Sequence, residues 1–280
     1  MGRSQGAPRV ADRSWVIHNI NGNNGEWPKI SVVTPSFNQG QYIEATINSV
    51  LGQGYPDLEY IIMDGGSTDG TVKILERYSE HLAYWASEPD EGQTDALIKG
   101  FNRADGDILC WLCSDDLFEP GALRDVAGVF AEHPDWQVIY GDSLWMDAAG
   151  RPIRPKKEID FNRFIWLYDH NYLPQPSTFW RCSIYEQVGG LDPRMKLAMD
   201  GDLWARFAER TALHHVPRTW SRMRYYPEQK NVRLRDTSDE EDALIRSRYL
   251  PDEPSWLRRL KWWPAKGLRV ALKLARGAYW

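Results

Sequence analysis

The sequence of 280 residues has few cysteines, no long apolar segment and, over residues 255–280, no acidic residue. Its three cysteines are too few and odd in number for a disulfide-rich secreted scaffold. No run of about 18 apolar residues occurs, so no helix is predicted to span a membrane. The N-terminus has no apolar signal segment, and Gly6 stands where a myristoylation signal needs Ser or Thr. We therefore expect a cytoplasmic protein.

Net charge argues against nucleic-acid binding, and the position of the cysteines argues against a redox or zinc site. The net charge of −5 argues against a nucleic-acid-binding protein, which would be basic overall. Cys110 and Cys113 have the spacing of a redox or zinc pair, but both lie in the apolar run 108–113. If that run is a strand, residues three apart point to opposite faces, so the two thiols cannot converge. Both cysteines are predicted to be structural and buried.

Strand-like and helix-like segments alternate between residues 30 and 141. The predicted strands are 30–34, 60–63, 84–85, 108–113 and 137–140, and the predicted helices are 43–52, 69–82, 94–101 and 121–130. This alternation predicts a parallel sheet with helices on both faces. Ligands of such sheets bind beyond the carboxyl ends of the strands, where the sequence places Ser36, Asn38, Asp64, Asp115 and Asp116.

The second half is less regular. A strand is predicted over 177–180 and a helix over 200–208, whose first turn carries Asp200 and Asp202. The helix dipole stabilises acids there, so capping is the simple alternative to a functional role. Ser238 and Glu241 form a capping box that predicts a helix running to about Tyr249.

Asp115 and Asp116 are adjacent acids at the end of a predicted buried strand, which requires a compensating cation. Carboxylate oxygens suit Mn²⁺ and Mg²⁺. The pair belongs to a set of six motifs that occur in order along the chain: Thr34-Pro-Ser-Phe-Asn38, Met63 to Thr71, Ser87-Glu-Pro-Asp90 with Gly92-Gln-Thr-Asp95, Ser114-Asp-Asp116, Gln175 to Trp180, and Met199 to Trp204.

In order and spacing these motifs resemble those of the inverting GT-A glycosyltransferases of family 2, over roughly residues 29–230. The resemblance implies an α/β fold of GT-A type, with a Rossmann-like, mostly parallel sheet flanked by helices. It implies transfer of a sugar from a nucleotide-diphosphate donor, with a UDP-sugar favoured, to a hydroxyl of a glycan or lipid-linked acceptor. Mn²⁺ or Mg²⁺ would be the cofactor.

The resemblance also assigns roles to residues of this chain. Asp116 would ligate the metal, and Asp200 would be the catalytic base. The nucleotide and donor would contact Thr34, Pro35, Ser36, Asn38, Asp64, Gly65, Asp95, Lys99 and Asp115. The acceptor would contact Gln175, Asp202 and Trp204. Two of these residues have simpler alternatives: Asp202 would cap its helix, and Lys99 would be a solvated charge.

Two positions depart from the family's pattern. Gly65 stands where many relatives carry a second acid, which leaves the identity of the base open. Tyr226 stands where relatives often show a histidine. Asp69 is interpreted as the N-cap of the helix that follows it.

Residues 255–280 hold seven Lys or Arg and four Trp. Pro264 is predicted to split this tail into two short helices. The second would place Lys266, Arg269, Lys273 and Arg276 on one face and apolar residues on another. A basic amphipathic helix of this kind is typical of contact with an anionic membrane, here the inner face of the cell membrane. The alternative is a helix packed against the catalytic domain.

Taken together, the sequence divides into a lead-in (1–28), a nucleotide-sugar-binding half (29–145), an acceptor-binding half (146–232), a linker helix (233–254) and the basic tail (255–280). Two other functions fit parts of the pattern. A sugar-1-phosphate nucleotidyltransferase would need a Gly-rich basic loop, which residues 34–38 do not provide. A non-catalytic membrane-surface relative would have lost Asp116 or Asp200, and both are present.

Overall fold

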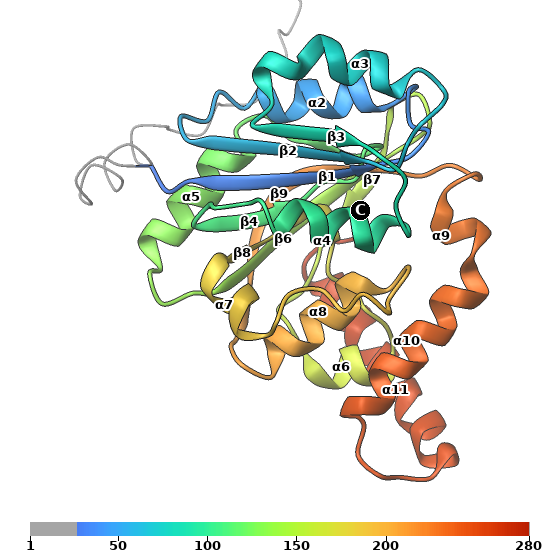
Figure 1. Cartoon of the computed structure of the whole chain (residues 1–280). Coiled ribbons are helices and arrows are strands. Elements are labelled where there is room, and N and C mark those ends of the chain that lie inside the picture. Colours follow the sequence, from blue (N-terminus) through green and yellow to red (C-terminus); the bar gives the residue numbers. More distant parts are fainter. Residues whose placement is uncertain (1–26, 280) are drawn as a thin grey trace, which may run out of the picture.

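The computed structural model describes residues 27–279, which form a single nine-stranded sheet covered by helices (Figure 1). The expected lead-in therefore lies mostly outside the described residues. The first four strands are parallel and adjacent in the order β3-β2-β1-β4: β1 (Ile30–Ser36), β2 (Leu58–Asp64), β3 (Tyr84–Ser87) and β4 (Ile108–Trp111). Ser36 pairs with Asp64, and Asp64 with Ser87, so these strands end at one edge. The predicted α/β fold is confirmed.

Beyond β4 the sheet changes direction. Strand β8 (Thr178–Arg181) is antiparallel to β4 and to β6 (Val138–Met146), and so separates two strands that the sequence pattern placed in one parallel set. Strand β9 (Leu213–Arg224) runs parallel to β6 and antiparallel to β5 (Leu117–Phe118), while β7 (Pro152–Lys156) pairs with β6. Because β9 reaches β5, residues near 224 lie beside residues 115 and 116.

Ten α-helices flank the sheet in the described residues. Figure 1 shows α2 (Ile43–Leu51) and α3 (Thr71–Tyr78) on one side of β1–β3 and α4 (Gln93–Phe101) on the other. The remaining helices are α5 (Ala122–Glu132), α6 (Arg163–Tyr168), α7 (Cys182–Gln187), α8 (Met199–Ala208), α9 (Lys230–Arg233), α10 (Arg235–Tyr249) and α11 (Ser255–Ala275). Short 3₁₀ turns occur at Ser79–His81 and Gln175–Ser177.

Three fully buried tryptophans join the two halves of the sheet to α8. Trp111 stacks on Trp204 with ring centroids 5.7 Å apart, and Trp180 packs edge-on against both rings. Burying such large rings is among the strongest contributions to a core. The expected role of Trp204 beside the acceptor is therefore wrong, because its ring has no exposed surface.

Two predicted helix starts differ from the structure. Helix α3 begins at Thr71 with Gly70 as the N-cap, although Asp69 still accepts the backbone N–H of Thr71 at 3.1 Å. Helix α10 begins at Arg235, so the predicted capping box at Ser238 does not exist. Glu241 instead accepts hydrogen bonds from a distant loop, at residues 196–198.

The basic tail forms one helix, α11, which continues through Pro264 rather than breaking there. Two cations of its basic face pair with acids of the domain: Arg269 pairs with Asp169 at 2.5 Å and Lys273 pairs with Glu158 at 2.8 Å. The alternative of packing against the domain therefore holds for these two side chains, and the predicted contact of the tail with a membrane stays a prediction. Within residues 27–279, no helix combines the length and apolarity needed to cross a membrane.

Candidate active site

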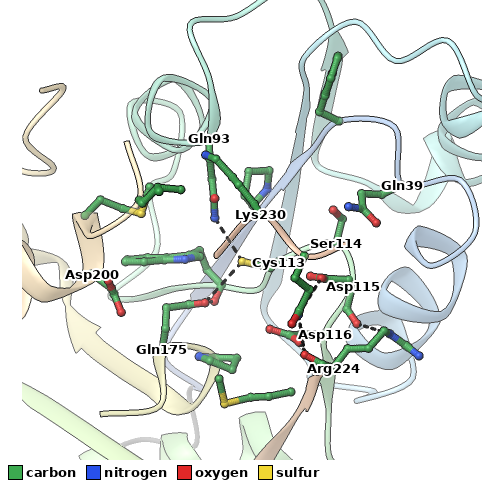
Figure 2. A pocket seen from close by; sticks show the side chains of 18 of the residues that line it. Gln39, Gln93, Cys113, Ser114, Asp115, Asp116, Gln175, Asp200, Arg224 and Lys230 are labelled. Carbon is green, nitrogen blue, oxygen red and sulfur yellow. Dashed lines mark hydrogen bonds between the residues drawn. The ribbon is translucent and has the colours of Figure 1, made fainter. Parts of the chain in front are cut away.

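One large cavity, of about 1030 Å³, opens at the carboxyl ends of β1 and β4 and is closed on its far side by α8, α9 and α10. Eight of the predicted site residues line it: Pro35, Ser36, Asn38, Gly65, Asp115, Asp116, Gln175 and Asp200. Figure 2 shows Asp200 on one side and Asp115 with Asp116 on the other, with Cys113 and Gln175 between them. The convergence expected from the strand ends is present.

The end of the cavity near β1 combines an aromatic ring and an acid that the sequence pattern did not single out. Phe37 lines the cavity with 60% of its surface exposed. A Cβ added at Gly65 would lie 2.7 Å from Oδ2 of Asp90, so any side chain at position 65 would displace that carboxylate. Asp90 lines the cavity and accepts the backbone N–H of Gly92 at 2.8 Å. Asp90 thus places a carboxylate beside the position where Gly65 provides none.

Asp64 and Thr34, two of the predicted donor contacts, form hydrogen bonds within the protein near this end of the cavity. Asp64 accepts hydrogen bonds from the backbone N–H of Ser67 at 2.8 Å and from the hydroxyl of Ser87 at 2.6 Å. Thr34 is fully buried, with its hydroxyl 3.1 Å from that of Tyr60. Neither residue lines the cavity.

Asn38 links the two strand-end loops. It has a left-handed backbone with φ of 51°, which Asn tolerates better than most residues. Its side-chain oxygen accepts the backbone N–H of Thr68 at 2.9 Å. Position 38 therefore holds the loop after β2 against the loop after β1.

The acidic pair is held from three directions. Thr46 of α2 places its hydroxyl 2.8 Å from the backbone oxygen of Asp116. Asp116 accepts the backbone N–H of Arg224 at 2.8 Å, and Asp115 accepts the hydroxyl of Tyr226 at 2.9 Å. Burial raises the pKa of Asp116 well above its ordinary range, and the charge of Asp115 raises it further. A bound cation would relieve both effects.

These carboxylates fit a hard divalent ion. Ligand atoms of Cys113, Asp115 and Asp116 all lie within 4.8 Å of one another. The two carboxylates suit Mn²⁺ or Mg²⁺, whereas a thiol is a poor ligand for either. Cys113 instead accepts the side-chain amide of Gln93 at 3.3 Å and lies 3.6 Å from Oε1 of Gln175. It is only half-buried, so the prediction of a buried structural residue is confirmed for Cys110 alone.

Arg224 and Tyr226 fix the loop of the acidic pair to β9. The guanidinium of Arg224 donates to the backbone oxygen of Asp115 at 2.8 Å and lies 4.4 Å above the ring of Tyr42. Tyr226, which stands at the family's histidine position, donates to Asp115 rather than offering a cation. The phenol therefore orients the pair without adding positive charge.

Asp200 begins the opposite wall, in the first turn of α8. Its carboxylate accepts the side-chain amide of Asn171 at 3.2 Å. Burial raises the pKa of Asp200 to about 6, and the nearby charge of Asp242 on α10 also raises it. A carboxylate with a pKa near 6 can take up a proton at neutral pH more readily than an ordinary one.

Helix α10 positions this wall through long-range contacts. The carboxylate of Glu241 accepts three consecutive backbone N–H groups, of Lys196, Leu197 and Ala198, at 2.8 to 2.9 Å. These residues lead directly into α8 and Asp200. No local sequence signal marks Glu241 or Asp242 for this role, because their partners lie about 45 residues earlier.

Besides Thr34, Asp64 and Trp204, three further predicted contacts lie outside the cavity. Asp95 and Lys99 pair with each other at 3.1 Å on α4, and Lys99 also lies 3.5 Å from Glu88, so the solvated-charge interpretation holds. Asp202 is fully buried and pairs with Arg206 at 2.7 Å and with Arg248 of α10 at 2.8 Å. An acceptor cannot reach it.

We expect Asp202→Asn to lower the free energy of unfolding by about 3 kcal/mol, because the change leaves two arginines facing a neutral buried group. Urea denaturation followed by circular dichroism measures this. Asp252→Asn is the matched control, since Asp252 is an exposed acid in the segment before α11. A loss below about 1 kcal/mol for Asp202→Asn would show that the buried pairs are not structural.

Comparison with known sequences identifies the family of the chain. The model of the family described as "Glycosyl transferase family 2" matches residues 31–189, more than half of the chain. An uncharacterized glycosyltransferase of Mycobacterium tuberculosis is 32% identical over 183 residues, covering 65% of this chain and 69% of the relative. A PGL/p-HBAD biosynthesis glycosyltransferase of Mycobacterium bovis is 28% identical over 190 residues, covering 66% and 72%.

Solved structures share the fold. TarS (residues 1–349) of S. aureus in complex with UDP-GlcNAc superposes with a TM-score of 0.62 at 19% identity, covering 84% of this chain and 70% of that one. The mannosyltransferase PcManGT of Pyrobaculum calidifontis, in complex with GDP-Man and Mn²⁺, gives 0.59 at 16% identity, covering 94% and 82%. With the family match over the strands that form the cavity, the chain belongs to glycosyl transferase family 2.

Proposed function

We propose that this glycosyltransferase moves a sugar from a nucleoside-diphosphate donor to an acceptor hydroxyl, with inversion at the anomeric carbon. The observation that carries the proposal is that the acidic pair Asp115–Asp116 and the carboxylate of Asp200 face one cavity from opposite walls (Figure 2). One wall can hold a metal-bound diphosphate and the other can accept a proton. This arrangement is the one that displacement of a diphosphate by a hydroxyl requires.

The donor nucleotide would lie at the β1 end of the cavity. Phe37 offers an exposed ring for stacking on a base, and Asp90 offers a carboxylate that can accept a base N–H. Pro35, Ser36, Asn38 and Gly65 complete this end. An accepting carboxylate can bind the N3–H of uracil, and we favour a UDP-sugar as donor because a neighbour of the same fold binds one. UDP-GlcNAc is bound by the TarS neighbour.

Asp116, with Asp115 beside it, would hold Mn²⁺ or Mg²⁺. When bound, this ion supplies charge compensation for the departing diphosphate. Lys230 of α9 also lines the cavity, where its ammonium donates to the backbone oxygen of Lys196 at 3.0 Å. It adds a protein cation to the same wall as the loop of Asp200.

Asp200 would act as the general base. As the acceptor oxygen forms its bond to the anomeric carbon, the bond from that carbon to the diphosphate oxygen breaks and the electron pair leaves with the diphosphate. The hydroxyl proton passes to Asp200. Attack from the face opposite the leaving group inverts the configuration. Asn171 donates to Asp200 and so positions this carboxylate, while the charge of Asp242 helps to raise its pKa.

The acceptor would enter between Gln175 and Asp200, within the half of the chain spanning residues 146–232, while residues 29–145 bind the donor. A glycan or a lipid-linked sugar can present a hydroxyl there. We place the reaction at an anionic membrane surface, where a lipid-linked acceptor is found.

Calorimetric titration with UDP, GDP and dTDP, each with and without Mn²⁺, tests this function. We expect UDP to bind most tightly and each nucleotide to bind more weakly without the ion. Binding that is unaffected by Mn²⁺, or no binding of any of the three, would contradict the proposal.

Asp90→Ala is expected to weaken UDP binding by about tenfold, the loss typical of one hydrogen bond to a charged group. Binding of UDP methylated at N3, which lacks this N–H, should change less. Glu91→Ala is the matched control, because Glu91 is exposed, adjacent and outside the cavity. Equal losses for UDP and for UDP methylated at N3 would show that Asp90 shapes the loop but does not bind the base N–H.

A further inference from the structure

The outward face of α11 is a continuous apolar stripe. Trp256 and Trp263 each have 66% of their surface exposed, and Leu260 has 60%. These residues are four and three positions apart, so they lie on one face of the helix. Leu274, also exposed, lies on the same face of the helix further along. None of these side chains belongs to the core cluster of the described residues.

The opposite face of α11 fixes this orientation. Ala265 is fully buried against the protein. Lys261 donates to the hydroxyl of Tyr168 on α6 at 3.1 Å and pairs with Glu253. Further along, Lys273 reaches Glu158, whose side chain has no exposed surface. The helix cannot turn its tryptophans inward without breaking these pairs and leaving buried carboxylates unpaired.

The charges around the stripe indicate what covers it. Arg259 is exposed beside Trp256 and Leu260, and Lys266 lies three residues after Trp263 with its ammonium 4.5 Å from the ring of Trp262. Neither cation has a carboxylate partner among the described residues, and residues 255–280 contain no acid. A stripe of Trp and Leu with a cationic border complements an anionic lipid surface.

A second copy of the chain fits this face less well. In a two-fold interface the same stripe would meet itself, so Arg259 and Lys266 of one copy would approach the cations of the other. No acid on α11 could compensate for this repulsion.

We propose that the stripe formed by Trp256, Leu260, Trp263 and Leu274 is the surface by which the protein lies on an anionic bilayer. The inference rests on the proposed membrane placement but not on the proposed chemistry. It adds an orientation to the membrane contact expected from the sequence, because the apolar face meets the lipid while Arg269 and Lys273 pair with the domain.

Co-sedimentation of the full chain with vesicles of phosphatidylcholine containing phosphatidylglycerol tests the stripe. The double variant Trp256→Ser, Trp263→Ser should bind at least about tenfold more weakly than the unchanged chain, since it removes the two largest interfacial side chains. Ile153→Ser, which changes an exposed apolar residue of β7, is the matched control and should bind normally. Vesicles of phosphatidylcholine alone should bind the unchanged chain more weakly.

UDP titration of the same variants separates this inference from the function, because nucleotide binding should be equal in all three proteins. Unchanged sedimentation of the double variant would overturn the proposal. So would a chain that does not sediment with either vesicle, in particular if light scattering shows a dimer that the double variant loses. Loss of UDP binding in the unchanged chain would contradict the function but leave the stripe intact.

Discussion

Asp200→Asn is expected to lower the rate of sugar transfer by about 10² to 10⁴-fold, the usual contribution of a general base, while leaving UDP binding within about twofold. The variant keeps the size of the side chain and the contact with Asn171, so the fold of α8 is retained. Release of UDP from a UDP-sugar measures the rate, and calorimetry measures the binding. A variant that keeps more than about a tenth of the activity would show that Asp200 is not the base.

The pH dependence of the transfer rate tests the role of Asp200 independently. Because the pKa of Asp200 is raised to about 6, the carboxylate is protonated below that pH and cannot accept a proton. The rate should therefore fall about tenfold per pH unit below about pH 6. Asp242→Asn removes a nearby negative charge, lowers the pKa of Asp200 and should move this limb to lower pH. A limb that stays in place would assign the titration to another group.

Asp116→Asn is expected to abolish the dependence of UDP binding on Mn²⁺ and to lower transfer by about 10² to 10³-fold. The amide oxygen can still accept the backbone N–H of Arg224, so the loop should keep its place. Removing the carboxylate removes the charge that a divalent ion requires. Calorimetry with and without Mn²⁺ measures the first effect, and UDP release measures the second.

Asp57→Asn is the control for this variant. Asp57 is an exposed acid directly before β2, at the end of the sheet away from the cavity, so its loss changes the net charge equally without touching the site. Thermal melting should give nearly the same midpoint for both variants. If Asp116→Asn keeps its response to Mn²⁺, the ion is held elsewhere.

The donor side of the site is largely predictable from the sequence, for a physical reason. In a parallel sheet the carboxyl ends of the strands meet at one edge, so residues that directly follow strands converge whatever their separation along the chain. Ser36 ends β1, Gly65 directly follows β2 and Asp115 lies in the loop after β4, and all three line the cavity. Strand patterns alone place them.

What the sequence could not give is the direction of individual side chains. Asp64 lies at a strand end like Asp115, and Asp202 lies in the first turn of the same helix as Asp200. In the structure, however, Asp64 accepts hydrogen bonds from loop hydroxyls and Asp202 pairs with two arginines. The role of Asp90 follows only from the structure, in which its carboxylate lies beside Gly65. These outcomes depend on partners far away in the chain, which periodicity and local motifs do not encode.

For the tail, too, the sequence does not determine which way the side chains point. The amphipathic pattern of α11 was evident, but two opposite faces could meet the domain. The choice depends on acids elsewhere, Glu158 and Asp169, whose side chains are held in the body of the protein. Ion pairing with those acids turned the basic face inward and the tryptophans outward.

The measurement that tests the central claim most directly is proton NMR of the first sugar released when the chain, Mn²⁺ and an α-linked UDP-sugar are incubated without added acceptor. Water then takes the place of the acceptor hydroxyl. We predict that the β-anomer forms first and that Asp200→Asn suppresses it. Initial release of the α-anomer, or no release of sugar from UDP-, GDP- or dTDP-sugars, would contradict inverting transfer at this site.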